Sequence, residues 1–315
     1  MTAFPAHERG AALLTVLLLV AVMTVVAATA LERLTLATRR AASGAAMDQA
    51  RLNQLAVEQL ALRRLGQMLS AKAPVADWID RPLTLSLPQG EAEFRFSDGG
   101  NCFNLNSLAS DDGDQRDRAR TQFAALIQLN GVTASAAGRI VAQAADWVDG
   151  DQLITPGGGE DHAYGDGART PDGPMADPSE LLALPAMTSA NWRLMAPWLC
   201  ALPHRDASTF NINTLRPGQA LLLGLMTPGL PLERARTLLA ARPSGGFAST
   251  NLFATELSAN TTPLAPSLLR QLSLTSRWFR LHSVVHLGGI DLAMDSLVDV
   301  ADGDPRIVQR RRETM

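Results

Sequence analysis

The sequence predicts an α+β protein in which a long N-terminal membrane-spanning helix packs on an antiparallel sheet, and a large α-helical domain is inserted between the two halves of that sheet. Three patterns predict this class. An uncharged apolar run over residues 11–31 leads into a helical pattern that continues to residue 73. Apolar and polar residues alternate over residues 83–97 and again over 278–300, and helical periodicity lies between these two stretches.

The N-terminal helix is predicted from an apolar run that leads into an amphipathic segment. Ala11 to Leu31 contains no charge, glycine or proline, and at about 1.5 Å per residue such a run spans roughly the 30 Å of a bilayer core. Backbone groups in lipid must be hydrogen-bonded within the segment, so the run is expected to be helical. Good helix formers continue to Ala73, with Leu55, Leu62, Leu65 and Leu69 on one apolar stripe and Glu58 off it.

Two simpler interpretations of this start stay open at this point. A secretory signal peptide has an apolar segment of about 7–15 residues before its cleavage site, and Ala27 to Ala30 offers such a site. The run here is longer than that, and the helical pattern continues beyond it. The second alternative is an ordinary single-pass anchor.

The soluble body is predicted to begin and end with a β-hairpin. The first joins residues 83–87 to 91–97 through a Pro-Gln-Gly turn, and the second joins 278–287 to 290–300 through Gly288-Gly289. Between them, two helix pairs are expected over residues 115–129 and 134–147, and over 217–225 and 232–241. The last residues, with Arg310 to Arg312, are expected to be a solvated tail.

Composition bounds the function classes. The chain has 315 residues, of which 46% are hydrophobic and 19% charged, and its net charge of −3 gives no global basic field for nucleic acid. Its two cysteines, Cys102 and Cys200, are too few for a four-ligand zinc site. In an oxidising compartment they can form a disulfide that closes a loop of about a hundred residues. Two separate buried thiols are the alternative.

The segment from residue 146 to 184 is dense in glycine, proline and carboxylates. Carboxylates crowded on one loop repel each other unless a cation lies among them, and calcium takes six to eight oxygen ligands from carboxylates and carbonyls. The spacing is not that of an EF-hand. A solvated acidic loop, a magnesium site and a two-carboxylate hydrolytic site remain alternatives, although no Ser or His is placed to complete the last of these.

The leader resembles that of type IV pilin-like proteins, because a short segment ending at Gly10 directly precedes the apolar run. The resemblance implies that prepilin peptidase cleaves between Gly10 and Ala11 and that the new terminus is methylated. Family members usually have Glu five residues into the mature chain, where this sequence has Thr15. A missing Glu is typical of the K-type minor pseudopilins of the bacterial type II (general) secretion system.

Four motifs of the soluble body resemble the same K-type group in order and spacing. They are Phe103-Asn104-Leu105-Asn106, Asp146-Trp147-Val148-Asp149-Gly150-Asp151, the set Gly158, Glu160, Asp161 and Tyr164, and Ser179-Glu180-Leu181. Members of the family bind calcium in this lobe. The resemblance therefore implies calcium ligands at Asp149, Asp151, Glu160, Asp161, Asp177 and Glu180.

The resemblance implies a non-enzymatic subunit at the tip of the secretion pseudopilus, which initiates pseudopilus assembly and serves protein export across the outer membrane. Its implied partners are the I-type and J-type minor pseudopilins, prepilin peptidase, secreted cargo and the outer-membrane channel. The implied domains are a leader (1–10), the membrane-spanning part of the helix (11–31), a pilin-like helix with first strands (32–110), an inserted helical domain (111–274), and C-terminal strands with a tail (275–315).

The implied location is the bacterial inner membrane, with the soluble domain in the periplasm. Arginines after the span, at Arg33, Arg39, Arg40 and Arg51, outnumber Arg9 before it, and the positive-inside rule alone would place the body in the cytoplasm. The pilin-like leader, the cysteine pair and the calcium-like loop favour the periplasm.

Three other functions are weaker alternatives. One is a minor pilin of a type IV pilus, and another is a calcium-dependent periplasmic hydrolase. The third is a membrane-anchored periplasmic DNA-binding protein that uses helix-hairpin-helix units, because the phrase Phe210-Asn211-Ile212-Asn213 repeats the earlier one before a second helix pair. Such hairpins bring backbone N–H groups to phosphate through Gly, and Pro231, which has no N–H, occupies one of these positions. We therefore expect no nucleic-acid partner.

Overall fold

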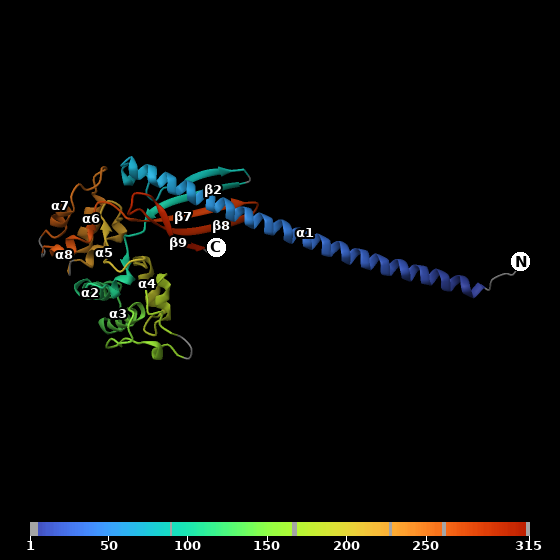
Figure 1. Ribbon diagram of the computed structural model, residues 1–315, viewed down its shortest axis with the longest axis horizontal. Helices are drawn as coiled ribbons and strands as arrows, with labels where there is room; N and C mark the ends of the chain where they lie inside the picture. The colour runs from blue at the N-terminus through green and yellow to red at the C-terminus, as the bar shows by residue number, and fades with distance from the viewer. Residues whose placement is uncertain (1–5, 89, 166–168, 227–228, 260–262, 313–315) are drawn as a thin grey trace.

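The computed structural model of the chain describes residues 6–88, 90–165, 169–226, 229–259 and 263–312 (Figure 1). The pilin-like part contains α1 (Ala6–Ser70), η1 (Val75–Asp77), β1 (Leu83–Leu87), β2 (Gly90–Asp98), β7 (Trp278–Leu287), β8 (Ile290–Asp299) and β9 (Arg306–Arg312). The first half of the helical lobe contains β3 (Phe103–Asn104), η2 (Leu105–Ala109), α2 (Gly113–Leu129), α3 (Ala134–Val148), η3 (Asp161–Ala163), η4 (Pro178–Ala183), α4 (Ser189–Met195), η5 (Ala196–Trp198) and β4 (Leu199–Cys200). The second half contains β5 (Phe210–Asn211), η6 (Pro217–Gln219), α5 (Leu221–Gly224), α6 (Leu232–Ala240), α7 (Thr250–Leu257), α8 (Pro266–Leu269) and β6 (Leu272–Ser273).

The two ends of the soluble chain share one antiparallel sheet, in the order β1-β2-β7-β8-β9. Both predicted hairpins are present, and they meet where β2 pairs with β7, from Gly90 opposite Leu287 to Asp98 opposite Phe279. Gly288 and Gly289 both have positive φ, at 55° and 82°, which the tight turn between β7 and β8 requires. The α+β pilin-like fold predicted from the sequence is confirmed.

One face of the second half of α1 packs on this sheet (Figure 1). The helix buries Ala50, Val57, Ala61, Leu65 and Met68 against sheet residues that include Phe94, Phe96, Leu281 and Val285. The predicted stripe was partly wrong, since Leu55 is exposed and Glu58 is fully buried. Glu58 can be buried because Arg310 Nε lies 2.9 Å from its Oε2 and Ser296 Oγ lies 3.1 Å from its Oε1.

The arginine-rich C-terminal segment is the fifth strand and not a solvated tail. β9 pairs with β8 through a bulge at Leu297 and Val298. Its arginines are matched by carboxylates that are remote in sequence, because Arg310 contacts Glu58 and Arg311 forms an ion pair with Asp177. Such pairing cannot be seen in a run of like charges, so the predicted solvated tail was wrong.

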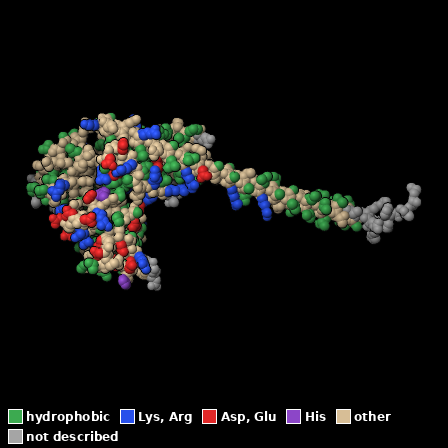
Figure 2. Space-filling view, in the orientation of Figure 1, with side chains coloured by type: hydrophobic (Ala, Val, Ile, Leu, Met, Phe, Trp, Pro, Cys, Tyr) green, Lys and Arg blue, Asp and Glu red, His purple; other side chains and the backbone are tan. Residues whose placement is uncertain are grey.

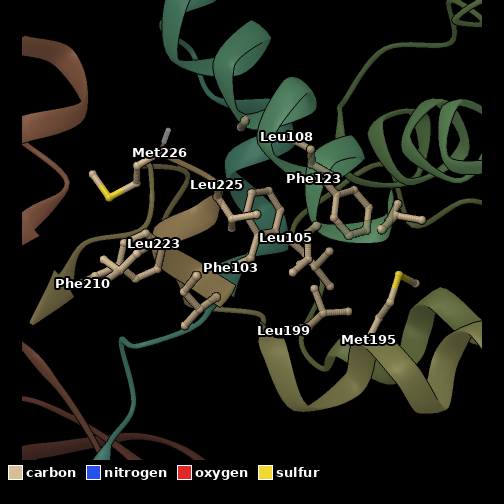
Figure 3. Close-up of a cluster of buried hydrophobic side chains, with 14 of the residues drawn as sticks. Phe103, Leu105, Leu108, Phe123, Met195, Leu199, Phe210, Leu223, Leu225 and Met226 are labelled. Atoms are coloured by element: carbon tan, nitrogen blue, oxygen red, sulfur yellow. The ribbon is translucent and has the colours of Figure 1, made fainter. Parts of the chain in front are cut away.

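The helical lobe lies beside the sheet and around the end of α1 (Figure 1). It begins earlier than the predicted residue 111, because Phe103, Leu105 and Leu108 pack in its core with Phe123 (Figure 3). The rings of Phe103 and Phe123 stack with centroids 5.1 Å apart. The chain therefore leaves the sheet after Asp98 and returns to it at Trp278.

The lobe is built from two similar halves. The first Asn-x-Asn phrase places Phe103 and Asn104 parallel to Leu199 and Cys200, and the second places Phe210 and Asn211 parallel to Leu272 and Ser273. The last asparagine of each phrase fastens a remote loop through its side-chain amide. Asn106 accepts from Met175 N and donates to Met175 O and Leu202 O, and Asn213 accepts from Phe247 N and donates to Phe247 O and Leu274 O. This equivalence supports an internal duplication.

Candidate functional site

The acidic loop is anchored at its start by Asp146, which is fully buried near the end of α3. Its carboxylate accepts hydrogen bonds from Thr155 N, at 3.1 Å, and from Gly159 N, at 2.9 Å. Glycine is required beside it, since a Cβ at Gly158 would lie 2.0 Å from Asp146 Oδ2. The sequence analysis did not select Asp146 as a site residue, although it is the first carboxylate of the Asp-Trp motif.

Three further carboxylates converge on Thr170. Its Oγ1 lies 3.2 Å from Glu160 Oε2, 3.1 Å from Asp161 Oδ1 and 2.7 Å from Asp172 Oδ1. A hydroxyl has one proton to donate, so it can satisfy only one of these acceptors at a time. Asp172 is a second residue that the sequence analysis missed, because it lies far along an irregular loop with no motif of its own.

Several oxygens of this acidic cluster, which we define as Asp146, Asp149, Glu160, Asp161 and Asp172, are buried without a partner. Asp149 Oδ1, Glu160 Oε1 and the hydroxyl of nearby Tyr164 have no hydrogen-bond partner among the described residues. Buried polar atoms are almost always paired, so these oxygens are suited to a proton, a water molecule or a cation as partner.

The electrostatics of the cluster agree with this. Burial, followed by the charges of Asp151 and Asp146, raises the pKa of Asp149 to about 6. Burial, together with neighbouring carboxylates, also raises the pKa of Glu160. Burial and the charges of Asp146 and Glu160 raise the pKa of Tyr164 to about 12. The cluster therefore favours protons or a cation over free negative charge.

The remaining predicted ligands have other contacts. Asp151 is exposed and accepts from Leu153 N at 2.8 Å. Glu180 accepts from Ala176 N and Asp177 N through Oε1 and from Trp147 Nε1 through Oε2.

Asp177 caps η4 and pairs with Arg311. Burial alone would raise its pKa, but hydrogen bonds from Ser179 and Arg311 hold the pKa of Asp177 below its ordinary value.

The structure thus divides the six predicted ligands. Asp149, Glu160 and Asp161 lie in the acidic cluster, and Asp151 is exposed outside it. Asp177 and Glu180 form the capping box of η4. Within the described ranges, no three Asp, Glu, His or Cys side chains already stand at metal-ligating distances.

A disulfide joins Cys102 to Cys200. Both cysteines are buried, in a cluster with Leu202 of the lobe and Trp278 and Leu297 of the sheet. The bridge therefore lies where the helical lobe meets the pilin-like part.

The first half of α1 extends away from the body as a bare helix (Figure 2). It is long and apolar enough to cross a membrane by length and composition, and none of that apolar window is buried. Gly10 and Ala11, the predicted cleavage site, lie within the continuous helix, and the leader residues 1–5 lie outside the described residues.

Beyond the apolar run, α1 keeps exposed apolar residues on the side turned away from the sheet. Leu34 and Leu52 are 62% and 61% exposed, and they lie five helical turns apart on the same side. Three exposed alanines lie on the same side of the helix. Ala41 and Ala45 lie between the two leucines, and Ala56 lies one turn after Leu52. This outer stripe of α1, comprising Leu34, Ala41, Ala45, Leu52 and Ala56, is a surface suited to another helix.

Comparisons with known proteins give a consistent result. Two family models described as "Type II secretion system (T2SS), protein K" match residues 101–204 and 210–275, which are the two halves of the helical lobe. Type II secretion system protein K of Pectobacterium carotovorum subsp. carotovorum is 30% identical, covering 97% of this chain and 96% of the relative. The protein K of Aeromonas hydrophila is 28% identical, covering 97% of each chain.

A solved structure has the same fold. A chain in the crystal structure of the GspK-GspI-GspJ complex from the enterotoxigenic Escherichia coli type 2 secretion system superposes with a TM-score of 0.77 and 27% sequence identity. The match covers 88% of this chain and all of that one.

Proposed function

This chain belongs to the type II secretion system protein K family, the K-type minor pseudopilins, and from that premise we propose that it forms the tip of the pseudopilus and initiates its assembly. The observation that carries the proposal is the helical lobe around the membrane-distal end of α1 (Figure 1). A shaft subunit has copies of itself above and beside it, and a lobe of more than half the chain would occupy that space. Only a subunit at the end of the filament leaves it free.

Thr15 supports the same position. In the pilin-like family that this chain resembles, a shaft subunit has a Glu at the position of Thr15. Its carboxylate meets the terminal amine of a neighbouring subunit in the membrane. A buried carboxylate without such a partner is costly in lipid. The hydroxyl of Thr15 carries no charge, so this helix can lie at the end of an assembly without a neighbour of that kind.

The proposed partners are the I-type and J-type minor pseudopilins. The similar solved chain is named as part of a complex with GspI and GspJ. In this chain, the outer stripe of α1 is free to receive the helices of such partners, since it faces away from the sheet. Apolar stripes with small residues such as Ala41, Ala45 and Ala56 let helix backbones approach closely.

We propose that the leader is removed between Gly10 and Ala11 by prepilin peptidase, that the new terminus is methylated, and that the soluble body lies in the periplasm of a protein anchored in the inner membrane. The Cys102–Cys200 disulfide supports the periplasm, because disulfides persist in oxidising compartments.

Calcium is the proposed ligand of the acidic cluster. Asp149 and Glu160 each present a buried oxygen without a partner among the described residues, and Asp161 and Asp172 lie beside them around Thr170. Hard carboxylate oxygens are what calcium prefers. When bound, the ion would neutralise the crowded carboxylates and hold the loop against α3.

We propose that the protein acts without catalysis in bringing cargo to the outer-membrane channel. The acidic cluster has no nucleophile within its described hydrogen bonds other than Thr170, which is fully engaged with carboxylates. A role in DNA binding is disfavoured by Pro231, which precedes α6 and has no N–H to donate to a phosphate.

The N-terminal mass of the membrane-extracted protein tests the proposal first, with and without co-expressed prepilin peptidase. Peptidase-dependent removal of the residues before Ala11 is expected, together with a methyl group. A terminus that stays intact, or a cut near Ala30, would contradict it. Capture of both I-type and J-type subunits by the processed protein, and loss of shaft assembly in its absence, test the tip role.

Calcium is tested by the thermal unfolding of the full chain in excess calcium and in excess chelator. Calcium is expected to raise the midpoint, because a ligand of the native state alone stabilises by RT ln(1 + [L]/Kd), about 2.7 kcal/mol at a hundred times Kd. The D149N variant should lose most of this shift, whereas D302N, which removes an exposed carboxylate elsewhere, should keep it. An equal midpoint with and without calcium would argue against the site.

A further inference from the structure

A cavity lies at the membrane-distal end of α1, away from the acidic cluster. It has a volume of about 410 Å³ and is enclosed by the last turn of α1, the segment that follows it, and the second half of the helical lobe. Its apolar wall includes Met68, Leu69, Leu274 and Phe279, and Trp78 also lines it. This volume is within the range of roughly 300–1,000 Å³ typical of ligand pockets.

All charged side chains among the described lining residues are cationic. They are Lys72, just after α1, and Arg242, just after α6. Neither forms an ion pair with any described residue. The buried Asp98 lies behind Ser276 of the wall, but its carboxylate is already held by Gly100 N, Asn101 N, Thr214 and Ser276. The cavity therefore has net positive charge without a counter-charge of its own.

Two buried donors of the same wall have no acceptor. Trp78 Nε1 and Arg242 Nε are inaccessible to solvent and make no hydrogen bond with the described residues. Arg242 is held in place, since its Nη2 donates to Leu215 O. Burial also lowers the pKa of its guanidinium. Unpaired buried N–H groups are rare in native structures, and both of these belong to residues that line the cavity.

The backbone at Lys72 adds an independent observation. Its φ is +49°, and Lys72 N donates to Leu69 O at 3.0 Å, so it closes α1 in the left-handed region. Glycine or asparagine usually occupies this position, because other side chains are strained there. The lysine side chain therefore starts from a fixed backbone position at the edge of the cavity.

We propose that this cavity binds an extended segment of another protein that carries one Glu or Asp side chain between apolar residues. The carboxylate would pair with the exposed Lys72 and with the Arg242 guanidinium, whose Nε, like Trp78 Nε1, would be reached after a local shift of side chains, and the flanking apolar side chains would contact Met68, Leu274 and Phe279.

A lipid headgroup is excluded as the occupant by position. Lys72 lies 41 residues beyond Leu31 on a continuous helix, which places it roughly 60 Å from the membrane surface. That the bound segment belongs to a partner meeting the pseudopilus tip rests on the proposed function. The chemistry of the cavity does not depend on that function.

The test uses the full chain in detergent and three labelled peptides with a central Leu-Glu-Leu, Leu-Gln-Leu or Ser-Glu-Ser sequence between Gly-Ser flanks and neutral ends. Binding is measured by fluorescence anisotropy, and by the indole N–H resonance of Trp78, assigned with W78F. We expect the Leu-Glu-Leu peptide to bind at least about tenfold more tightly than either other peptide, and to shift the Trp78 resonance.

Matched variants separate the cavity from general charge. R242Q and K72Q should each weaken binding of the Leu-Glu-Leu peptide by about tenfold and abolish its preference over Leu-Gln-Leu. R81Q removes the same charge from an exposed residue near the same end of α1 but outside the cavity lining, and it should bind as the unmodified chain does. Thermal unfolding verifies that each variant is folded, and W78F, which keeps the aromatic ring, removes one donor without removing charge.

Four outcomes would overturn the proposal. The first is no saturable binding up to about millimolar peptide, and the second is equal binding of the Glu and Gln peptides. The third is that R81Q weakens binding as much as R242Q or K72Q does. The fourth is self-association of the chain that R242Q abolishes, which would assign the cavity to a second copy. All are measured on the purified chain, so they are independent of whether pseudopilus assembly or export fails.

Discussion

At the scale of single residues, buried charge decides more of this structure than the sequence suggests. Glu58, Asp98, Asp146 and Asp299 are buried or nearly so, and each carboxylate is held by donors from another segment. A buried charge is tolerated only when it is paired and hydrogen-bonded. These residues therefore join segments to each other, whereas Asp149 and Glu160 each have a buried oxygen without a partner among the described residues.

The ion pair of Asp299 and Arg277 gives a pH-dependent prediction. Arg277 Nε and Nη2 lie 2.9 and 3.0 Å from the two oxygens of Asp299, and this pairing lowers the pKa of Asp299 against the opposing effect of burial. Since the folded-state pKa is depressed, the stabilisation is present above the unfolded value near 3.9 and is lost as pH falls through the folded one. D299N should lower the free energy of unfolding at pH 7 by about 1–3 kcal/mol, and by less near pH 3, because the loss begins below the unfolded pKa.

Urea unfolding at both pH values measures this effect. D302N is the matched control, because Asp302 is exposed and its ion pair with Arg306 should contribute less than about 1 kcal/mol. An equal loss for D299N at both pH values would show that packing, and not charge, explains it.

Gly158 gives a second prediction at this scale. A Cβ there would overlap Asp146 Oδ2 and also lie 3.0 Å from Thr155 O, so G158A should displace the acidic loop. Loss of the two buried hydrogen bonds of Asp146 would cost about 1–3 kcal/mol each.

The matched control is G138A, on the exposed side of α3 with no atom within 4 Å of the added Cβ. It should raise stability by roughly 0.5–1 kcal/mol. Hydrogen exchange of residues 149–165 would locate the change, and unaltered protection of this segment in G158A would contradict the predicted displacement.

At the scale of elements, α1 has two surfaces with different tasks. Its inner side is fixed by apolar burial and by Glu58, and its outer side carries the apolar outer stripe. An exposed apolar stripe of this length is typical of a surface that contacts another protein or a membrane.

Two leucine variants separate these surfaces. L65A removes a fully buried side chain and should lower the free energy of unfolding by about 2–5 kcal/mol. L52A removes a side chain that is 61% exposed, and it should leave stability nearly unchanged while reducing recovery of the I-type and J-type partners.

Thermal unfolding and co-purification are measured on both variants. The assignment of the outer stripe would fail if L52A recovered the partners as fully as the unmodified chain did.

The duplicated Asn-x-Asn phrase has the same structural role in both halves of the helical lobe. Each phrase forms a short parallel bridge and fastens a loop through its asparagine amides. The sequence pattern resembles helix-hairpin-helix units but disfavours DNA binding, and in the structure the repeated phrase contributes Phe103 and Phe210 to the core of the lobe (Figure 3).

At the scale of the whole molecule, a main junction between the helical lobe and the pilin-like part lies where the chain leaves the sheet after Asp98 and returns to it at Trp278. Asp98, Ser276 and Thr214 form one hydrogen-bonded group there, and the disulfide packs beside it against Trp278. The ring of His204 stacks on the same tryptophan.

The disulfide is therefore expected to stabilise the junction. It closes a loop with a sequence separation of 98 residues, for which chain entropy predicts up to about 4.7 kcal/mol. The double variant C102S/C200S should unfold at a lower temperature, with the largest loss of hydrogen-exchange protection in the first half of the lobe.

Reduction of the unmodified protein should have the same effect as the double variant. If neither treatment lowered the unfolding temperature, the bridge would be dispensable for the junction.

The sequence by itself determined the features that depend on neighbours in the chain. Periodicity was sufficient for α1, both hairpins and the helices α2 and α3, because local burial patterns repeat within one element. The motifs with Phe103-Asn104-Leu105-Asn106 and with Asp146 to Asp151 were sufficient to indicate the family, which the comparisons confirmed. The calcium ligands, the leader cleavage and the tip position stay predictions.

Only the tertiary structure decided the features that depend on contacts between distant segments. The burial of Glu58 and the strand formed by Arg306–Arg312 require each other across 252 residues. The division of the acidic residues into a cluster and a capping box depends on how the loop folds back on α3 and β9. The early boundary of the lobe depends on Phe103 meeting Phe123. A charged or aromatic residue has no fixed environment until its remote partner is in place, and a local pattern cannot identify that partner.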